Sequence, residues 1–169
     1  MTQCVGIDLT EGMAKEYNKA AENQGIPRSE MVAYTGNLID PSDPSPAALS
    51  GPEFYDFDIA AVGLGFHHFD DPALATRRLA ERLKPGGVLL IIDFEPHEHL
   101  HHHHHDNPAT KTVTHMGFSE ADTKKMFEEA GVGNNFEYVV LGKGIVFTDK
   151  SDESKSFSRK VFMARGSKV

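Results

Sequence analysis

The 169-residue sequence predicts an α/β fold with a mostly parallel sheet and a C-terminal antiparallel hairpin. The first observation is a pair of short apolar runs, Ile59 to Leu64 and Val88 to Ile92, joined by a helical segment. Buried parallel strands are continuous apolar runs, and a crossover helix must connect them. The second observation is that two more runs, Phe136 to Leu141 and Lys160 to Ala164, close the chain without a helix between them.

The first 35 residues predict a strand, a helix and a second strand. Alternating apolar residues indicate a buried strand over Gln3 to Leu9, and Thr10 is a typical helix N-cap. The helix is expected to end at Gly25, before the next strand, Met31 to Thr35. Its expected apolar face holds Met13, Tyr17 and Ala20 or Ala21.

A proline-rich segment precedes the central strand-helix-strand unit. Residues 41–52 contain four prolines, which predict a surface connection with one short helical turn at Ala47 to Leu49. The central helix is expected to begin near Pro72, and the segment Leu83 to Gly87 to form the turn into the next strand. Its expected buried face holds Leu74, Ala75, Leu79 and Leu83, and Arg77, Arg78, Glu81 and Arg82 lie largely on the other face.

The last third of the chain predicts an insertion, a helix and the closing hairpin. Residues 95–113 form a polar, His-rich insertion. The sequence Ser119-Glu-Ala-Asp122 resembles a capping box and predicts the start of a helix that stops at Gly131. The charged segment Asp149 to Lys155 is expected to connect the two strands of the hairpin.

Length and composition predict a single domain over residues 1–169. A net charge of -8 argues against a nucleic-acid partner, because phosphate recognition needs clustered Lys and Arg. The sequence shows neither a secretory signal nor a membrane-length apolar stretch, and its one cysteine, Cys4, is expected to be a packed thiol. These features predict a cytoplasmic protein without a membrane partner.

Four segments of the sequence stand out together: VGIDLTEGM, GNLID, FDIAAVGLGFHHFDDP with LKPGGVLLIID, and SEADTKKMFEEAGV. In this combination and order they resemble the class I S-adenosylmethionine-dependent methyltransferases of the small-molecule type. The resemblance implies a Rossmann-like class I methyltransferase sheet, and it covers nearly the whole chain.

The resemblance implies a set of residues that contact S-adenosylmethionine. Asp8, with Leu9 beside it, stands where the family's acidic residue takes the ribose hydroxyls. Asn37 and Leu38 stand where the family contacts adenine, and Gly65 follows the fourth strand of the family's sheet. A helix-capping or loop carboxylate is the alternative for Asp8, and a plain turn is the alternative for Asn37.

The family's first strand and Gly-rich loop would precede residue 1, so the domain is expected to be N-terminally truncated. Gly63-Leu64-Gly65 does not replace the loop, because histidines follow it, and we expect close backbone packing there. Since the family's first strand lies between its second and fourth, three arrangements are open. The second and fourth strands pair directly, another chain supplies the missing strand, or the sequence is a fragment.

Histidines provide the candidate catalytic groups. His67 and His68 follow a parallel strand, where ligands of open α/β sheets bind, and His68 is the first candidate for a general base. The alternative is a structural pair. Asp93 and Glu95 are candidate cleft carboxylates or capping groups, and His115 is a candidate substrate contact or packed loop residue.

The tract with His97, His99, His101 to His105 and Asp106 could bind a transition metal. It has no fixed ligand spacing and no Cys partner, so we expect a solvated insertion and no metal site.

The predicted function is transfer of a methyl group from S-adenosylmethionine to an oxygen or carbon of a small molecule. The first rival is a catalytically inactive methyltransferase-like subunit or remnant that binds a partner chain, in a homo- or hetero-oligomer that completes the sheet. The second rival is a cleft used for chemistry other than methylation.

Overall fold

A computed structural model describes residues 3–97, 112–149 and 152–169. The His-rich tract beyond His97, predicted to be a solvated insertion, lies outside the described residues. The chain divides into two compact units, Met1–Tyr55 and Asp56–Val169, which we describe one at a time. The single domain expected from the length of the chain therefore stays a prediction.

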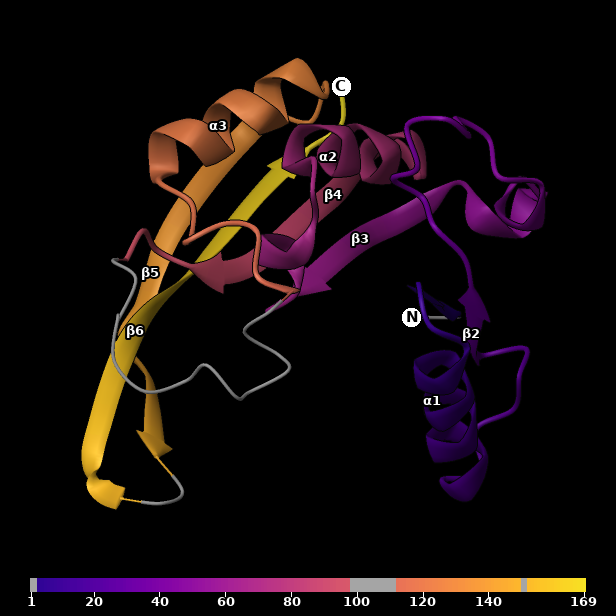
Figure 1. The fold of residues 1–169 in the computed structure, drawn as a ribbon. Coiled ribbons are helices and arrows are strands. Elements are labelled where there is room, and N and C mark those ends of the chain that lie inside the picture. Colours follow the sequence, from indigo (N-terminus) through magenta and orange to yellow (C-terminus); the bar gives the residue numbers. More distant parts are fainter. Residues whose placement is uncertain (1–2, 98–111, 150–151) are drawn as a thin grey trace. The chain divides into compact units, whose positions relative to one another are not determined.

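The first unit is built on two parallel strands. β1 (Cys4–Asp8) pairs with β2 (Met31–Thr35), and α1 (Glu11–Asn23) connects them (Figure 1). The two strands and the helix agree with the predictions. The predicted cap is also confirmed, because the side chain of Thr10 accepts a hydrogen bond from the Met13 amide. The Cys4 Sγ lies 3.2 Å from the Tyr17 hydroxyl, as expected of a packed thiol.

The predicted apolar face of α1 is correct at Ala21 and at the half-buried Tyr17 but wrong at Met13. Ala14 is buried in its place, whereas Met13 is 60% exposed. The polar Asn18 belongs to the buried side because its amide group hydrogen-bonds both the N–H and the carbonyl of Ala33 in β2, at 2.8 and 2.9 Å. A side chain that satisfies two backbone groups sets the rotation of the helix, and apolar periodicity gives no sign of it.

The proline-rich segment carries two short 3-10 helices, η1 (Ala47–Leu49) and η2 (Pro52–Phe54). The predicted turn at Ala47 to Leu49 is confirmed. Leu49 is completely buried and packs on Gly36, where a Cβ atom would lie only 2.6 Å from the leucine side chain. Gly36 therefore allows the connection to lie against the end of β2.

The second unit begins with a parallel pair of strands. β3 (Phe57–Gly63) pairs with β4 (Leu83–Phe94), and between them come η3 (Phe66–His68) and α2 (Pro72–Glu81). The segment Leu83 to Gly87 belongs to β4 and is not the separate turn that the sequence predicted. Leu83 already pairs with Phe57, and the glycines are needed there because Gly86 has a φ of +77° and Gly87 lies against the Phe57 carbonyl.

Two expectations about the central helix and its strand are wrong. Arg82 is buried although the sequence placed it on the polar face, and its carbonyl accepts the Phe57 amide. The glycines around Leu64 are not closely packed, since a Cβ on Gly63 would meet nothing within 4 Å. The left-handed residue is Leu64 itself, with a φ of 53°, which turns the chain from β3 into η3.

The closing helix and hairpin complete the unit. α3 (Glu120–Glu129) begins at the predicted cap, where the Asp122 amide donates to the Ser119 hydroxyl. β5 (Asn134–Asp149) and β6 (Asp152–Ser167) form an antiparallel hairpin much longer than expected. Asp149 and residues 152–155, predicted as parts of a charged connection, are in strands, because the pairing continues through stacked Phe147 and Phe157.

The strand order of the second sheet is β3-β4-β6-β5, and α2 and α3 lie on one of its faces (Figure 1). The α/β class with a C-terminal antiparallel hairpin is therefore confirmed. The core on this face includes Leu89, Ile91, Phe127, Phe162 and Ala164, all of which are inaccessible to solvent.

In the described residues, β1 and β3 belong to separate sheets. The three arrangements that the sequence left open for the missing strand stay predictions. Among the described helices, none is long and apolar enough to cross a membrane.

Candidate functional site

The candidate site of the second unit lies where β3 and β4 end. Asp93, next to last in β4, is completely buried, and its carboxylate accepts three hydrogen bonds. One oxygen accepts the Phe94 amide at 2.7 Å and the Nδ1–H of His67 at 2.8 Å, and the other accepts the His67 amide at 3.1 Å. A carboxylate of the sheet thus holds both the main chain and the ring of His67.

This contact fixes the tautomer of His67. Because a carboxylate oxygen accepts and does not donate, the proton of the neutral imidazole lies on Nδ1, and Nε2 keeps its lone pair. No hydrogen bond from the described residues occupies Nε2, and 9% of the side chain remains accessible. His67 therefore has the orientation that a proton acceptor needs, although most of its surface is buried.

The neighbouring His68 is held by a different partner. Its Nδ1 lies 2.9 Å from the Thr112 carbonyl, so Nδ1 again carries the proton. The two imidazole rings are 4.2 Å apart, at an interplanar angle of 40°. Both predicted histidines therefore meet at one place, but only His67 contacts a carboxylate.

The segment before α3 closes over these histidines. The His67 carbonyl accepts the amides of Thr114 and His115, each at 3.1 Å, and the Thr114 hydroxyl donates to the carbonyls of His67 and Phe69. His115 is thus a loop residue that contacts the site, and its buried Nε2 has no hydrogen-bond partner in the described chain. The sequence alone gave no signal for the roles of Thr112 and Thr114.

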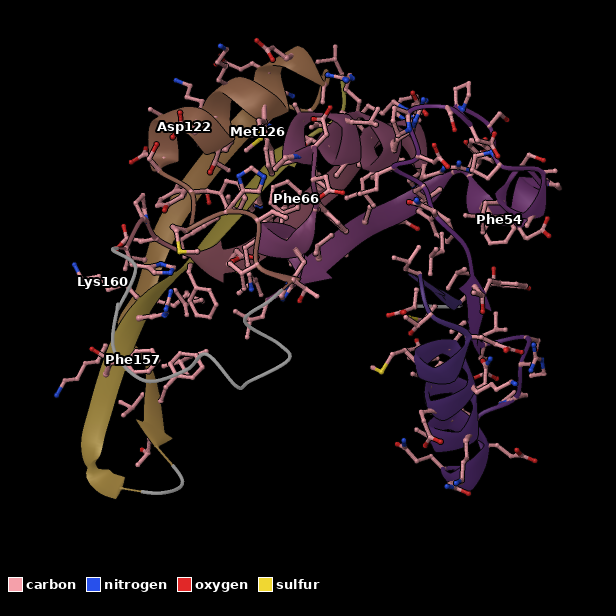
Figure 2. All side chains as sticks on the ribbon, in the orientation of Figure 1. Phe54, Phe66, Asp122, Met126, Phe157 and Lys160 are labelled. Atoms are coloured by element: carbon pink, nitrogen blue, oxygen red, sulfur yellow. The ribbon has the colours of Figure 1, made fainter. Side chains whose placement is uncertain are left out.

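A hollow of about 470 Å³ lies beside this segment, between the first turns of α2 and α3. Asp70, Asp71 and Asp122 form its acidic side, and Pro72, Phe118 and Met126 form its apolar side. Figure 2 shows Asp122 and Met126 on α3 and Phe66 on η3 below them. The carboxylates make this hollow unsuitable for an anion.

The predicted cofactor residues of the first unit lie at the ends of its two strands. Asp8 ends β1, and its main-chain carbonyl accepts the Gly36 amide at the end of β2. One carboxylate oxygen of Asp8 accepts both the amide and the hydroxyl of Thr10, each at 2.8 Å. The other oxygen has no partner among the described residues, so Asp8 forms the loop and still offers an acceptor.

Asn37, like Asp8, uses one polar atom of its side chain in its own loop and leaves the other available. Its carbonyl oxygen accepts the Ile39 amide at 3.0 Å, which is the turn expected as the alternative to ligand contact. Its amide N–H₂ has no acceptor within the described chain. Leu38 is half-buried beside it, and Leu9, next to Asp8, is 70% exposed. Polar and apolar groups thus occupy one end of the β1-β2 pair.

Gly65 belongs to the second unit, where it precedes η3 and accepts the His68 amide at 3.2 Å. A Cβ atom there would make only ordinary contacts, at 3.9 Å, so internal packing does not require a glycine. The described residues contain no cluster of three or more side chains suited to a metal ion.

A fold of this kind, with carboxylate, amide and imidazole groups at the strand ends, is that of a class I methyltransferase. The family model described as "Methyltransferase domain" matches residues 1–91, more than half of the chain. The chain therefore belongs to the S-adenosylmethionine-dependent methyltransferase family, as the sequence motifs predicted.

Three similar proteins illustrate the relationship. An uncharacterized methyltransferase of Schizosaccharomyces pombe is 27% identical over 164 residues, which cover 94% of this chain and 55% of that protein. The ubiquinone/menaquinone biosynthesis C-methyltransferase UbiE of Cellvibrio japonicus is 31% identical over 78 residues, 44% of this chain and 31% of the relative. The crystal structure of Bacillus subtilis YcgJ has a TM-score of 0.70 at 16% identity, covering 99% of this chain and 82% of that one. The chain thus spans about half the length of the yeast relative and a third of UbiE.

Replacing Asp93 by Asn tests the central contact of the site. The variant places an N–H₂ group opposite an N–H of His67, so we expect a loss of roughly 1–3 kcal/mol in the free energy of unfolding, measured in urea. Asp58→Asn, on the exposed face of β3 in an ion pair with Lys84, is the matched control and should change stability little. Equal effects of the two substitutions would show that Asp93 does not organise the site.

Proposed function

We propose that this chain transfers a methyl group from S-adenosylmethionine to an oxygen or carbon atom of a small molecule. The observation that carries the proposal is the pairing of His67 with the buried Asp93, 2.8 Å apart, at the end of two parallel strands. Ligands of open α/β sheets bind at this edge.

The first unit supports the cofactor part of the proposal. The free oxygen of Asp8 is an acceptor suited to a ribose hydroxyl, and the free amide of Asn37 is a donor suited to a ring nitrogen of adenine. The exposed side chain of Leu9 offers apolar surface beside them. S-adenosylmethionine supplies a methyl group on a positively charged sulfur.

The second unit supports the acid-base part. The neutral Nε2 of His67 is suited to accept the proton of a phenol, enol or carboxylic acid acceptor. Asp93 stabilises the imidazolium that results, as a carboxylate does in a catalytic triad. The Nδ1 of His68 contacts the carbonyl and the hydroxyl of Thr112, which are both uncharged, so the geometry favours His67 as the base over the histidine that the sequence placed first.

Two features favour oxygen or carbon acceptors in small molecules. The sequence FHHF follows β3 where amino-methylating relatives would carry an Asn-Pro-Pro-Tyr-like motif, and the net charge of -8 opposes binding to nucleic acid. UbiE, by its name, is a C-methyltransferase of quinone biosynthesis. We extend that acceptor type to this chain only as part of the proposal.

Cofactor binding is tested by calorimetry with S-adenosylmethionine on wild type and Asp8→Ala. Loss of a charge-assisted acceptor should weaken binding roughly 10- to 100-fold. Asp40→Ala is the matched control, because Asp40 also accepts the amide and hydroxyl of a residue two positions later, Ser42. Equal affinities of the two variants, or no binding to wild type, would contradict the assignment.

The base is tested by turnover of methyl-labelled S-adenosylmethionine with a panel of phenols, enols, carboxylic acids and amines. His67→Gln should lower kcat by roughly 10²- to 10⁴-fold at unchanged cofactor affinity and remove the acidic limb of the pH-rate profile. A purely structural role would instead lower stability and leave the pH dependence of the remaining activity unchanged. Methylation of amines alone would contradict the proposed acceptor class.

A second candidate function, binding of a partner chain, is favoured by the free edge of β3. β3 pairs only with β4 among the described strands, and Ile59 is 59% exposed. An unpaired edge is suited to the addition of an extended strand, and the occupant we propose is a second copy of this chain. Sedimentation velocity should then show a concentration-dependent dimer that Ile59→Lys dissociates. A wild-type monomer at all concentrations would exclude it.

A further inference from the structure

A second hollow, of about 340 Å³, lies in the second unit beside the residues that follow β4. Its walls are Glu95, Pro96 and His97 on one side and Ser158, Arg159 and Lys160 of β6 on the other. Figure 2 shows Phe157 and Lys160 along β6. The cofactor and base assignments above use none of these groups.

Arg159 is the central group of this hollow. Its guanidinium carbon lies 5.3 Å from the ring centre of Phe157 and 5.9 Å from that of Phe94. No hydrogen bond or ion pair from the described residues holds its N–H groups. Arg165 on the same strand differs, since it donates two hydrogen bonds, at 2.9 and 3.0 Å, to Glu137.

A half-buried cation without an anion is costly. Burial lowers the pKa of Arg159, because a charge held away from water is less stable. The two rings compensate part of this cost by cation-π attraction. Since the contacts to Phe94 and Phe157 lie over ring faces, the donor fork of the guanidinium remains available for a planar, bidentate oxyanion.

The charges around the hollow indicate which oxyanion fits. Lys160 adds a second positive charge, and Glu95, 3.9 Å from the Lys160 ammonium, contributes one negative charge. A single positive charge therefore remains. A carboxylate neutralises it, whereas a phosphate dianion would leave one negative charge unbalanced beside Glu95.

We propose that this hollow binds the carboxylate of a small organic acid through Arg159, and that this acid is the methyl acceptor. Phe94 connects the two places, because its ring lies 5.3 Å from the ring of His67 as well as against Arg159. The claim that this acid is the methyl acceptor rests on the proposed methyl transfer. The claim that a carboxylate binds at Arg159 is independent of the proposed methyl transfer.

The test is calorimetric titration of the whole chain with benzoate, with benzyl alcohol as the uncharged counterpart and inorganic phosphate as the competing oxyanion. Benzoate should bind about tenfold or more tightly than benzyl alcohol, and phosphate should not displace it. Equal affinities of benzoate and benzyl alcohol, or displacement of benzoate by equimolar phosphate, would overturn the proposal. Both measurements use the wild-type protein.

Substitutions locate the site. Arg159→Gln should weaken benzoate binding about tenfold or more, and Arg159→Lys should restore only part of it, because an ammonium lacks the fork. Arg165→Gln makes the same change in charge on the same strand and should leave benzoate binding unchanged. An unchanged affinity in folded Arg159→Gln, checked by circular dichroism, would refute the assignment.

The same samples separate this inference from the proposed function. Benzoate binding without any binding of S-adenosylmethionine would contradict the methyl transfer and leave the carboxylate site in place. Binding of S-adenosylmethionine with no binding of benzoate would contradict the carboxylate site and leave the proposed methyl transfer in place.

Discussion

The buried carboxylate of Asp93 is the group on which the arrangement of the second unit's site depends. It has no access to water, so its oxygens must be matched by donors of the protein, and two of the three donors belong to His67. The His67 carbonyl in turn accepts two amides from the segment before α3. Asp93 and His67 thus join the ends of β3 and β4 to the segment before α3. The same hydrogen bonds stabilise this region and orient the imidazole of His67.

In the first unit, Asp8 and Asn37 are candidate ligand residues that also stabilise their own loops. One oxygen of Asp8 holds the turn into α1, and the carbonyl of Asn37 holds the turn after β2. The remaining polar atom of each side chain has no partner among the described residues. Structural and ligand-binding interpretations of such residues are therefore compatible, because a short polar side chain has more hydrogen-bonding positions than a turn uses.

The two hollows of the second unit have opposite charge. Three aspartates surround the hollow beside α2 and α3, whereas an arginine and a lysine face the one beside β6. In a chain with a net charge of -8, a half-buried arginine that has no ion pair in the described part of the chain is not explained by the overall balance of charge. A local function for Arg159 is the simpler explanation, and the aromatic residues that enclose it come from β4 and β6.

The sequence by itself determined the local elements of this protein. The caps Thr10 and Ser119, the start of α2 at Pro72 and the strand Met31–Thr35 follow from rules that involve residues a few positions apart. The motifs around these elements were enough to identify the methyltransferase family. Only the tertiary structure decided that Asn18 turns α1 toward β2, that Phe147 and Phe157 prolong the hairpin, and that the Asp93 carboxylate contacts the ring of His67. Each of these contacts joins residues at least ten positions apart, and the pairing of distant polar and aromatic groups depends on strand register and packing, for which no local pattern exists.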